Sequence, residues 1–153
     1  MFLCSQSLFH RNVSYSAYTN TFWVHQDSKI QQFDASVLVE KSVGLVNGYS
    51  YPKDLFDLLN DAQAEIDFAV DDVTNIRKLA FGRVDLIIAD YANTMSIVRS
   101  KKLNIRALIP THSSDKLYPS LNSNLIAEQK LLNGALEALL QDGTVDAIYR
   151  THL

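Results

Sequence analysis

Cysteine, long apolar runs and clusters of basic residues are scarce or missing in this sequence, and each scarcity excludes a class of protein. Cys4 is the only cysteine in 153 residues, so the chain cannot form an internal disulfide framework. No apolar run approaches the roughly 18 residues that a membrane-spanning helix requires. The net charge is −3 and the Lys and Arg residues form no dense block, which argues against binding to nucleic acid.

Residue patterns for catalysis are missing as well. The four histidines lie far apart and show no metal-ligand spacing. Cys4 has no evident partner for a role as nucleophile. The turn before Pro52 is not a nucleophile elbow, because Pro52 stands where that motif requires its second glycine. We therefore expect a protein that is not an enzyme, with no catalytic residue, no metal and no cofactor.

The N-terminus also lacks the pattern of a signal peptide, because residues 1–7 have no basic region followed by a long apolar one. If Met1 is the true start, we expect a cytoplasmic protein. What is present is the composition of an ordinary globular domain, with 47% hydrophobic and 20% charged residues. The length suits one domain with a substantial core.

Short apolar segments alternate with helical patterns along the middle of the chain. The apolar segments are residues 42–46, 66–70, 84–89 and 105–109. Ser50 suits the N-cap of the first helix and Pro52 its first turn, and Asp71 and Asp72 suit the start of the second. Three strand–helix units with short connections predict an α/β fold with a mainly parallel sheet flanked by helices.

Asp90 stands out within this alternation. It follows the apolar run Leu86–Ala89, which is typical of a strand buried on both faces of a sheet. The carboxyl ends of strands in open α/β sheets face the ligand crevice, so Asp90 is a candidate site residue.

The two ends of the chain differ from the middle. Residues 18–25 are aromatic and favour a strand, whereas residues 111–124 are rich in Ser, Asn and Pro and are typical of an irregular link. Residues 124–141 form an amphipathic helix pattern that Gly143 closes.

Three motifs occur in an order and spacing that resemble the bacterial extracellular solute-binding protein family 3, the amino-acid-binding components of ABC transporters. The motifs are Gly44-Leu45-Val46-Asn47-Gly48-Tyr49-Ser50, then Leu79 to Asp90 around Gly82, then Leu139-Leu140-Gln141-Asp142-Gly143-Thr144-Val145-Asp146-Ala147-Ile148-Tyr149. The resemblance implies the type II periplasmic binding protein fold, with the N-terminal part of the first lobe lacking. Residues 1–36 would be a remnant of the first lobe and the crossing strand between lobes. Residues 37–110 would be the second lobe, and residues 111–153 the return link and the C-terminal helix of the first lobe.

The resemblance also implies a ligand site. Gly48, Tyr49 and Ser50 would hold a ligand carboxylate at a helix N-terminus, and Asp90 would accept hydrogen bonds from a ligand ammonium group. Local structural roles are the alternative: Gly48 makes the turn, Ser50 caps the first helix and Asp90 caps the third.

Two functions therefore compete. The preferred one is solute binding for an ABC transporter, with a small polar ligand such as an amino acid, a permease as partner and a periplasmic location. The alternative is a truncated, ligand-free domain that acts as an oligomeric protein-interaction scaffold. In either case we expect a homo-oligomer built through the N-terminal strand and the C-terminal helix, because nothing in the chain remains to cover their apolar surface.

Overall fold

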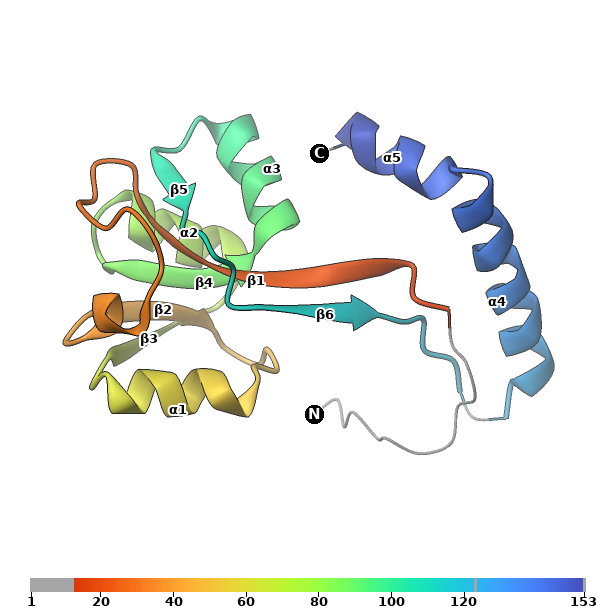
Figure 1. Ribbon diagram of the computed structural model, residues 1–153, viewed down its shortest axis with the longest axis horizontal. Helices are drawn as coiled ribbons and strands as arrows, with labels where there is room; N and C mark the ends of the chain where they lie inside the picture. Colours follow the sequence, from red (N-terminus) through yellow and green to blue (C-terminus); the bar gives the residue numbers. More distant parts are fainter. Residues whose placement is uncertain (1–12, 123, 153) are drawn as a thin grey trace. The chain divides into compact units, whose positions relative to one another are not determined.

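The computed structural model describes residues 13–122 and 124–152 (Figure 1). Cys4 and the other residues before Val13 lie outside the described part. The elements follow one another as β1 (Ser16–His25), the short 3-10 helix η1 (Ala35–Leu38), β2 (Ser42–Val46), α1 (Lys53–Asp61), β3 (Glu65–Ala69), α2 (Asp72–Ala80), β4 (Leu86–Asp90), α3 (Tyr91–Lys101), β5 (Ile105–Ala107), β6 (Ser113–Leu117), α4 (Ile126–Gln141) and α5 (Thr144–His152). None of the described helices is both long enough and apolar enough to cross a membrane.

The strands form one mixed sheet in the order β3-β2-β4-β1-β5, with β6 paired to β1. β2 is parallel to both β3 and β4, and β1 is antiparallel to β4 and to β5. The four strands predicted from the alternation are confirmed, and all four run in the same direction. The sheet is not mainly parallel in its pairing, however, because the antiparallel crossing strand β1 lies between β4 and β5.

β4 is buried on both faces, as its apolar sequence predicts. Leu86 and Ile88 pack with Phe22 and Val24 against the α1 side of the sheet. Ile87 packs on the other side in a second core, which Figure 1 shows covered by α2 and α3. Alternate residues of β1 and β4 therefore face opposite layers of helix, as the period of two in a strand requires.

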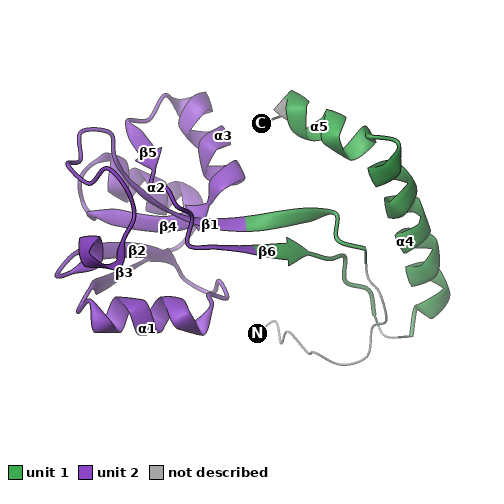
Figure 2. Cartoon of the chain, viewed as in Figure 1, with its two compact units in different colours: residues 1–18, 115–153 green, residues 19–114 purple. Residues whose placement is uncertain are grey.

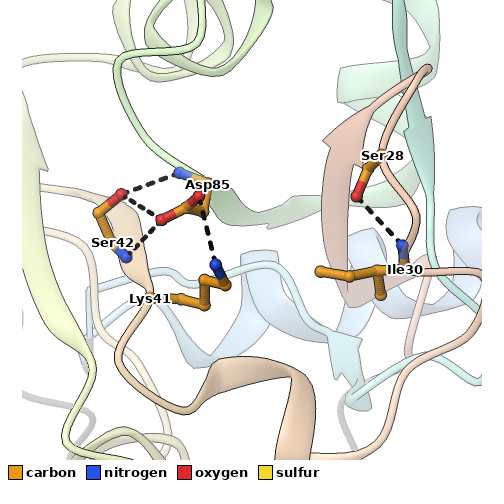
Figure 3. Close-up of polar contacts among 5 residues, drawn as sticks. All are labelled: Ser28, Ile30, Lys41, Ser42 and Asp85. Carbon is orange, nitrogen blue, oxygen red and sulfur yellow. Dashed lines mark hydrogen bonds and ion pairs between the residues drawn. The ribbon is translucent and has the colours of Figure 1, made fainter.

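The amino ends of β2 and β4 are joined by a polar contact (Figure 3). Asp85 Oδ2 accepts hydrogen bonds from the backbone N–H of Ser42 (3.0 Å) and from its hydroxyl (2.9 Å). The Lys41 ammonium lies 3.9 Å from Asp85 Oδ1. These bonds lie at the amino ends of the strands, so they leave the carboxyl ends free to carry a site.

Helix α2 packs tightly against the sheet at Gly44 in β2. A Cβ atom at this position would lie 2.2 Å from Asn75 Oδ1 and 3.0 Å from Ile87 Cγ2. Asn75 is completely buried in α2 and donates from Nδ2 to the Gly44 carbonyl at 3.2 Å. Only glycine at position 44 leaves room for this contact.

Two local predictions are wrong, and one helix was not predicted. The link at residues 111–124 contains the strand β6, whose pairing with β1 supplies the regular structure that its polar sequence does not indicate. Gly143 closes α4 as predicted, but an unpredicted helix, α5, follows it directly, and Tyr149 in α5 donates a hydrogen bond to the Ser16 hydroxyl. Ser50 does not cap α1: the N-cap is Pro52, which leaves the cap without a side-chain hydrogen bond.

The chain divides into two compact units (Figure 2). One consists of residues 19–114 and contains the sheet with α1, α2 and α3. The other consists of residues 1–18 and 115–153 and contains α4 and α5. The candidate site residues all lie in the unit of residues 19–114.

We predict that Gly44→Ala destabilises the protein by about 2–3 kcal/mol, because the added methyl group overlaps a side chain that is itself locked in the core. Chemical denaturation measures the change. The matched control is Gly134→Ala in α4, where a Cβ would meet nothing within 4 Å. There the substitution is expected to stabilise the helix by about 0.5–1 kcal/mol. Equal effects of the two substitutions would contradict the close-packing explanation.

Candidate functional site

The carboxyl ends of β2, β3 and β4 lie along one rim of the sheet, because these strands are parallel neighbours. α1, α2 and α3 begin shortly after those strand ends, so their N-termini gather at the same rim. Gly48 makes the turn after β2 with a φ of 80°, a left-handed conformation that glycine adopts without strain. Tyr49 and Ser50 follow it and are exposed.

Asp72 ties two of these helix starts to the turn after β2. Its Oδ2 accepts a hydrogen bond from the Tyr49 hydroxyl at 2.8 Å and another from Asn93 Nδ2 at 3.2 Å. The bond to Asp72, strengthened by the charge of that carboxylate and by partial burial, raises the pKa of Tyr49 to about 12. The Tyr49 ring is thereby held at the rim although 47% of the residue is exposed.

Asp90 ends β4 and is the N-cap of α3. Its Oδ1 accepts from the backbone N–H of Asn93 at 2.8 Å, and its Oδ2 accepts from the backbone N–H of Thr19 in β1 at 3.1 Å. The capping role anticipated from the sequence is therefore present. These two hydrogen bonds do not occupy all the acceptor positions of the Asp90 carboxylate, because its two oxygens together offer about four.

The hydrogen bonds connect the candidate residues into one chain of contacts. Tyr49 binds Asp72, Asp72 binds the side chain of Asn93, and the backbone of Asn93 binds Asp90. Tyr49 and Asp90 are thus brought to the same rim, as expected from the resemblance. Gly48 and Ser50 lie in the same turn as Tyr49 but take no part in this chain.

Carboxylates dominate the charge of the rim. Asp54 lies in the first turn of α1, Asp71 and Asp72 cap and begin α2, and Asp90 caps α3. Asp71 accepts from the backbone N–H of Thr74 at 2.7 Å, a bond that lowers the pKa of the Asp71 carboxyl. This confirms the capping role expected for Asp71.

Cations are few by comparison. Within the first turns of α1, α2 and α3 the only basic residue is Lys53, and its ammonium is paired with Asp57 at 2.6 Å. A cationic group that reaches this rim therefore meets unbalanced negative charge.

Two buried polar atoms lie beside the rim on the α1 face of the sheet. Asn20 Oδ1 and His112 Nε2 have no hydrogen-bond partner among the described residues. The imidazole of His112 packs edge-on against Phe22, and its Nε2 lies 4.0 Å from Asp54 Oδ2. No three His, Cys, Asp or Glu side chains of the described part are grouped as a metal site requires.

Asp71 and Asp72 follow a strand, so the sequence allows them to line the ligand edge, but it favours helix capping for both. The sequence does not indicate Thr19, Asn20 or Asn93. Thr19 and Asn20 lie in the predicted crossing strand, but only the pairing of β1 with β4 brings them to Asp90. That pairing is not encoded in any local motif.

The sequence matches no family model and no curated protein. Its structure matches many solved structures of binding proteins. A probable amino-acid ABC transporter extracellular-binding protein of Bacillus subtilis, ytmK, has a TM-score of 0.79 at 20% identity, with 93% of this chain and 62% of that chain covered. The GluR0 ligand-binding core complexed with L-glutamate has a TM-score of 0.77 at 17% identity and the same coverage. An ancestral arginine-binding protein bound to arginine has a TM-score of 0.75 at 21% identity, with 93% and 63% covered.

These matches confirm the predicted resemblance at the level of the fold, which is that of type II periplasmic binding proteins. The chain spans about three fifths of the length of the structures it matches, 62% in the case of ytmK. The matched proteins bind amino acids or serve their transport, and none of the three is described as an enzyme.

We predict that Asp72→Asn lowers the pKa of Tyr49 from about 12 towards the ordinary value of 10, because the charged acceptor of its hydroxyl is removed. NMR of the labelled Tyr49 ring carbon next to the hydroxyl follows this titration. The control is Asp71→Asn, which removes the same charge one residue away without touching the bond. A raised pKa stabilises the fold below pH 10, and this contribution disappears as the pH rises to 12 and beyond. An unchanged Tyr49 pKa in Asp72→Asn would contradict the assigned hydrogen bond.

Proposed function

We propose that this chain is a solute-binding protein, or part of one, that recognises a small polar ligand of the amino-acid class at the carboxyl rim of its sheet. The observation that carries the proposal is the chain of contacts from Tyr49 through Asp72 and Asn93 to Asp90. These contacts connect the turn before α1 with the Asp90 carboxylate. The N-terminus of a helix attracts carboxylates, whereas a carboxylate attracts ammonium groups.

In this proposal the ligand lies across the rim with its two charged ends separated. The turn Gly48-Tyr49-Ser50 and the start of α1 receive the ligand carboxylate. The backbone N–H of Tyr49 takes no part in this, because it already donates to the Val46 carbonyl at 3.4 Å. Asp90 accepts hydrogen bonds from the ligand ammonium group with the lone pairs that Thr19 and Asn93 leave free. The solved structures of the same fold that contain L-glutamate and arginine support an amino acid as the ligand class.

The wider biological role follows from the same relatives. We propose that residues 37–110, within the unit of residues 19–114, correspond to the second lobe, and that residues 1–36 and 111–153 contribute the interlobe strands and part of the first lobe. The partner is then an ABC transporter permease, and the location is periplasmic. The description of ytmK as an extracellular-binding protein of an ABC transporter supports both. The function is binding rather than catalysis.

We predict that isothermal titration with a panel of L-amino acids gives weak, micromolar or weaker, binding. Closed pockets bury about 70–90% of a ligand's surface, and one rim of a single lobe covers only part of it. Asp90→Asn is expected to weaken binding at least tenfold. Asparagine remains a good N-cap, so α3 keeps its cap while the negative charge is lost.

The matched control is Asp71→Asn, which makes the same change at the N-cap of the neighbouring helix α2. It is expected to change the dissociation constant less than threefold. Submicromolar binding by a proven monomer would contradict the argument from partial coverage, and absence of any amino-acid binding would overturn the proposed function.

A second function, an oligomeric scaffold, is favoured by one observation in the unit that contains α4 and α5. α4 contains no buried residue along its 16 described positions, although it is rich in leucine. Its most exposed apolar residues are Leu131 at 75% and Ile126 at 61%, and Ile148 in α5 is 55% exposed. Apolar surface of this extent is unusual on a monomer, so we propose that α4 takes part in self-association. The N-terminal strand β1 does not offer the uncovered edge expected from the sequence, because it is paired with β4, β5 and β6.

We predict that Leu131→Glu shifts the protein towards the monomer, because it places a charge on the exposed face without disturbing a packed residue. Size-exclusion chromatography with light scattering measures the species. Lys130→Gln, at the preceding position of the same helix, makes the same change of one unit in net charge and is expected to leave the mass unchanged. A wild-type protein that stays monomeric at high concentration would eliminate the scaffold.

A further inference from the structure

β3 forms one edge of the sheet in the unit of residues 19–114. The strand order is β3-β2-β4-β1-β5, so β2 is the only neighbour of β3 among the described strands. The odd positions of β3 turn their backbone groups towards that neighbour. The backbone N–H of Glu65 donates to the Lys41 carbonyl at 2.8 Å, and the Ala69 carbonyl accepts from the backbone N–H of Asn47 at 2.8 Å. β3 is therefore paired on one side only.

The even positions of the strand turn their backbone groups the other way, because alternate residues of a strand bond to opposite sides. These positions are Ile66, Phe68 and, directly after the strand, Val70. Their side chains follow the α1 side of the sheet, where Ile66 packs against the core. Phe68 and Val70 are 53% and 81% exposed. Unpaired backbone groups beside exposed apolar side chains are a template for pairing with a further strand.

Little in β3 prevents such pairing. The strand contains no proline, and its register with β2 runs from end to end without a bulge. The Lys78 ammonium reaches the edge from α2, where it lies 2.6 Å from Asp67 Oδ1 and donates to the Phe68 carbonyl at 3.1 Å. A carbonyl oxygen has two lone pairs, so that of Phe68 can accept a second hydrogen bond. The ion pair also balances the charge of Asp67 at the centre of the edge.

A second copy of the strand fits this edge in an antiparallel register with a two-fold axis at Phe68. In that register the outward backbone groups of the two copies meet, and Phe68 exchanges both of its hydrogen bonds with Phe68 of the other copy. Ile66 lies opposite Val70, and by symmetry Val70 lies opposite Ile66. Residues opposite each other share a face, so all three apolar side chains of each copy meet apolar partners.

The charges favour the same register. With the axis at Phe68, Asp67 lies opposite Ala69 of the other copy. An axis one residue away would place Asp67 opposite a second carboxylate, that of Asp67 or that of Asp71, which is unfavourable. At the two ends of the favoured register Glu65 faces Asp71, and salt screens the repulsion between these exposed groups.

We propose that two copies of this chain pair through β3, antiparallel about a two-fold axis at Phe68, so that their sheets join into one. The interaction surface is the free edge formed by residues 66–70, and its partner is the same edge of a second copy. The inference goes beyond the proposed function and does not rest on it. It is also separate from the self-association proposed for α4, because the two surfaces share no residue.

The first test is size-exclusion chromatography with light scattering on the full chain that carries Leu131→Glu, so that α4 no longer contributes. The species that remains at high concentration is expected to be a dimer. Adding Phe68→Asp is expected to raise the dimer dissociation constant at least tenfold, because two carboxylates then face each other at the axis. The matched control is Phe81→Asp, at the C-cap of α2, where Phe81 is 73% exposed. It is expected to leave the dimer unchanged.

The second test examines the register by cysteine cross-linking in a Cys4→Ser, Leu131→Glu background. Phe68→Cys is expected to form a disulfide-linked dimer under mild oxidation, because the two copies of position 68 face each other. Val70→Cys is the control, although Val70 is the more exposed residue. The two copies of position 70 lie four residues apart along the pair, or about 13 Å, which is too far for a disulfide.

A dimer that is lost with Phe68→Asp and cross-links through position 68 alone supports the proposal. A Leu131→Glu protein that is monomeric at every concentration would overturn it, as would equal effects of Phe68→Asp and Phe81→Asp. Cross-linking through position 70 at the rate of position 68 would contradict the register. If circular dichroism shows that Phe68→Asp does not fold, the two cysteine variants decide the outcome by themselves.

Discussion

The pairing of β1 with β4 is the constraint on which the candidate site depends. β4 is parallel to β2 on one side and antiparallel to β1 on the other, so it lies inside the sheet, and the two cores packed on the sheet bury both of its faces. The same register places Thr19 where its backbone N–H reaches Asp90 and places Asn20 opposite that residue. A slip of one residue would turn Asn20 to the α2 side of the sheet and bring Phe22 out of its core. The apolar alternation of β1 therefore fixes the polar geometry at the rim.

The same carboxylates stabilise the fold and shape the site. Asp71 and Asp90 cap α2 and α3, and Asp72 binds Tyr49 and Asn93. Capping and ligand binding are usually treated as alternatives for such residues, but a carboxylate that accepts one bond at each oxygen still has acceptor capacity. Capping also orients the carboxylate in advance, which lowers the entropic cost of using it for binding. The local role of Asp90 thus favours the functional role.

Much of this unit follows from the sequence, and the reasons for the failures are physical. Short apolar runs predict β2 and β4 well, because burial on both faces leaves a continuous signal. β3 and β5 are only partly buried, and they were predicted from their short apolar runs and their place in the strand–helix alternation. β6 has the exposed polar sequence Ser113–Leu117, so its strand conformation comes from pairing with β1 and not from burial. Asp90 is a candidate from the sequence because it ends an apolar strand, and Tyr49 because it lies in the turn between a strand and a helix and the family resemblance points to it. The sequence does not indicate that Asn20 lies at the rim, because Asp90, which it faces across the β1–β4 pair, lies 70 positions further along the chain.

The rim offers complementary groups to a ligand but covers it from one side only. In a fold where two lobes close around the ligand, each lobe supplies part of the contact area and closure excludes water. Electrostatic contacts at an open rim are screened by solvent, whereas the same contacts in a closed pocket are stronger because the surroundings are less polar. In the proposed function, the contacts of Asp90 select the charge of a ligand group, while high affinity depends on what covers the opposite side. The proposal therefore assigns selectivity for charge to the residues at this rim and affinity to the binding surface as a whole.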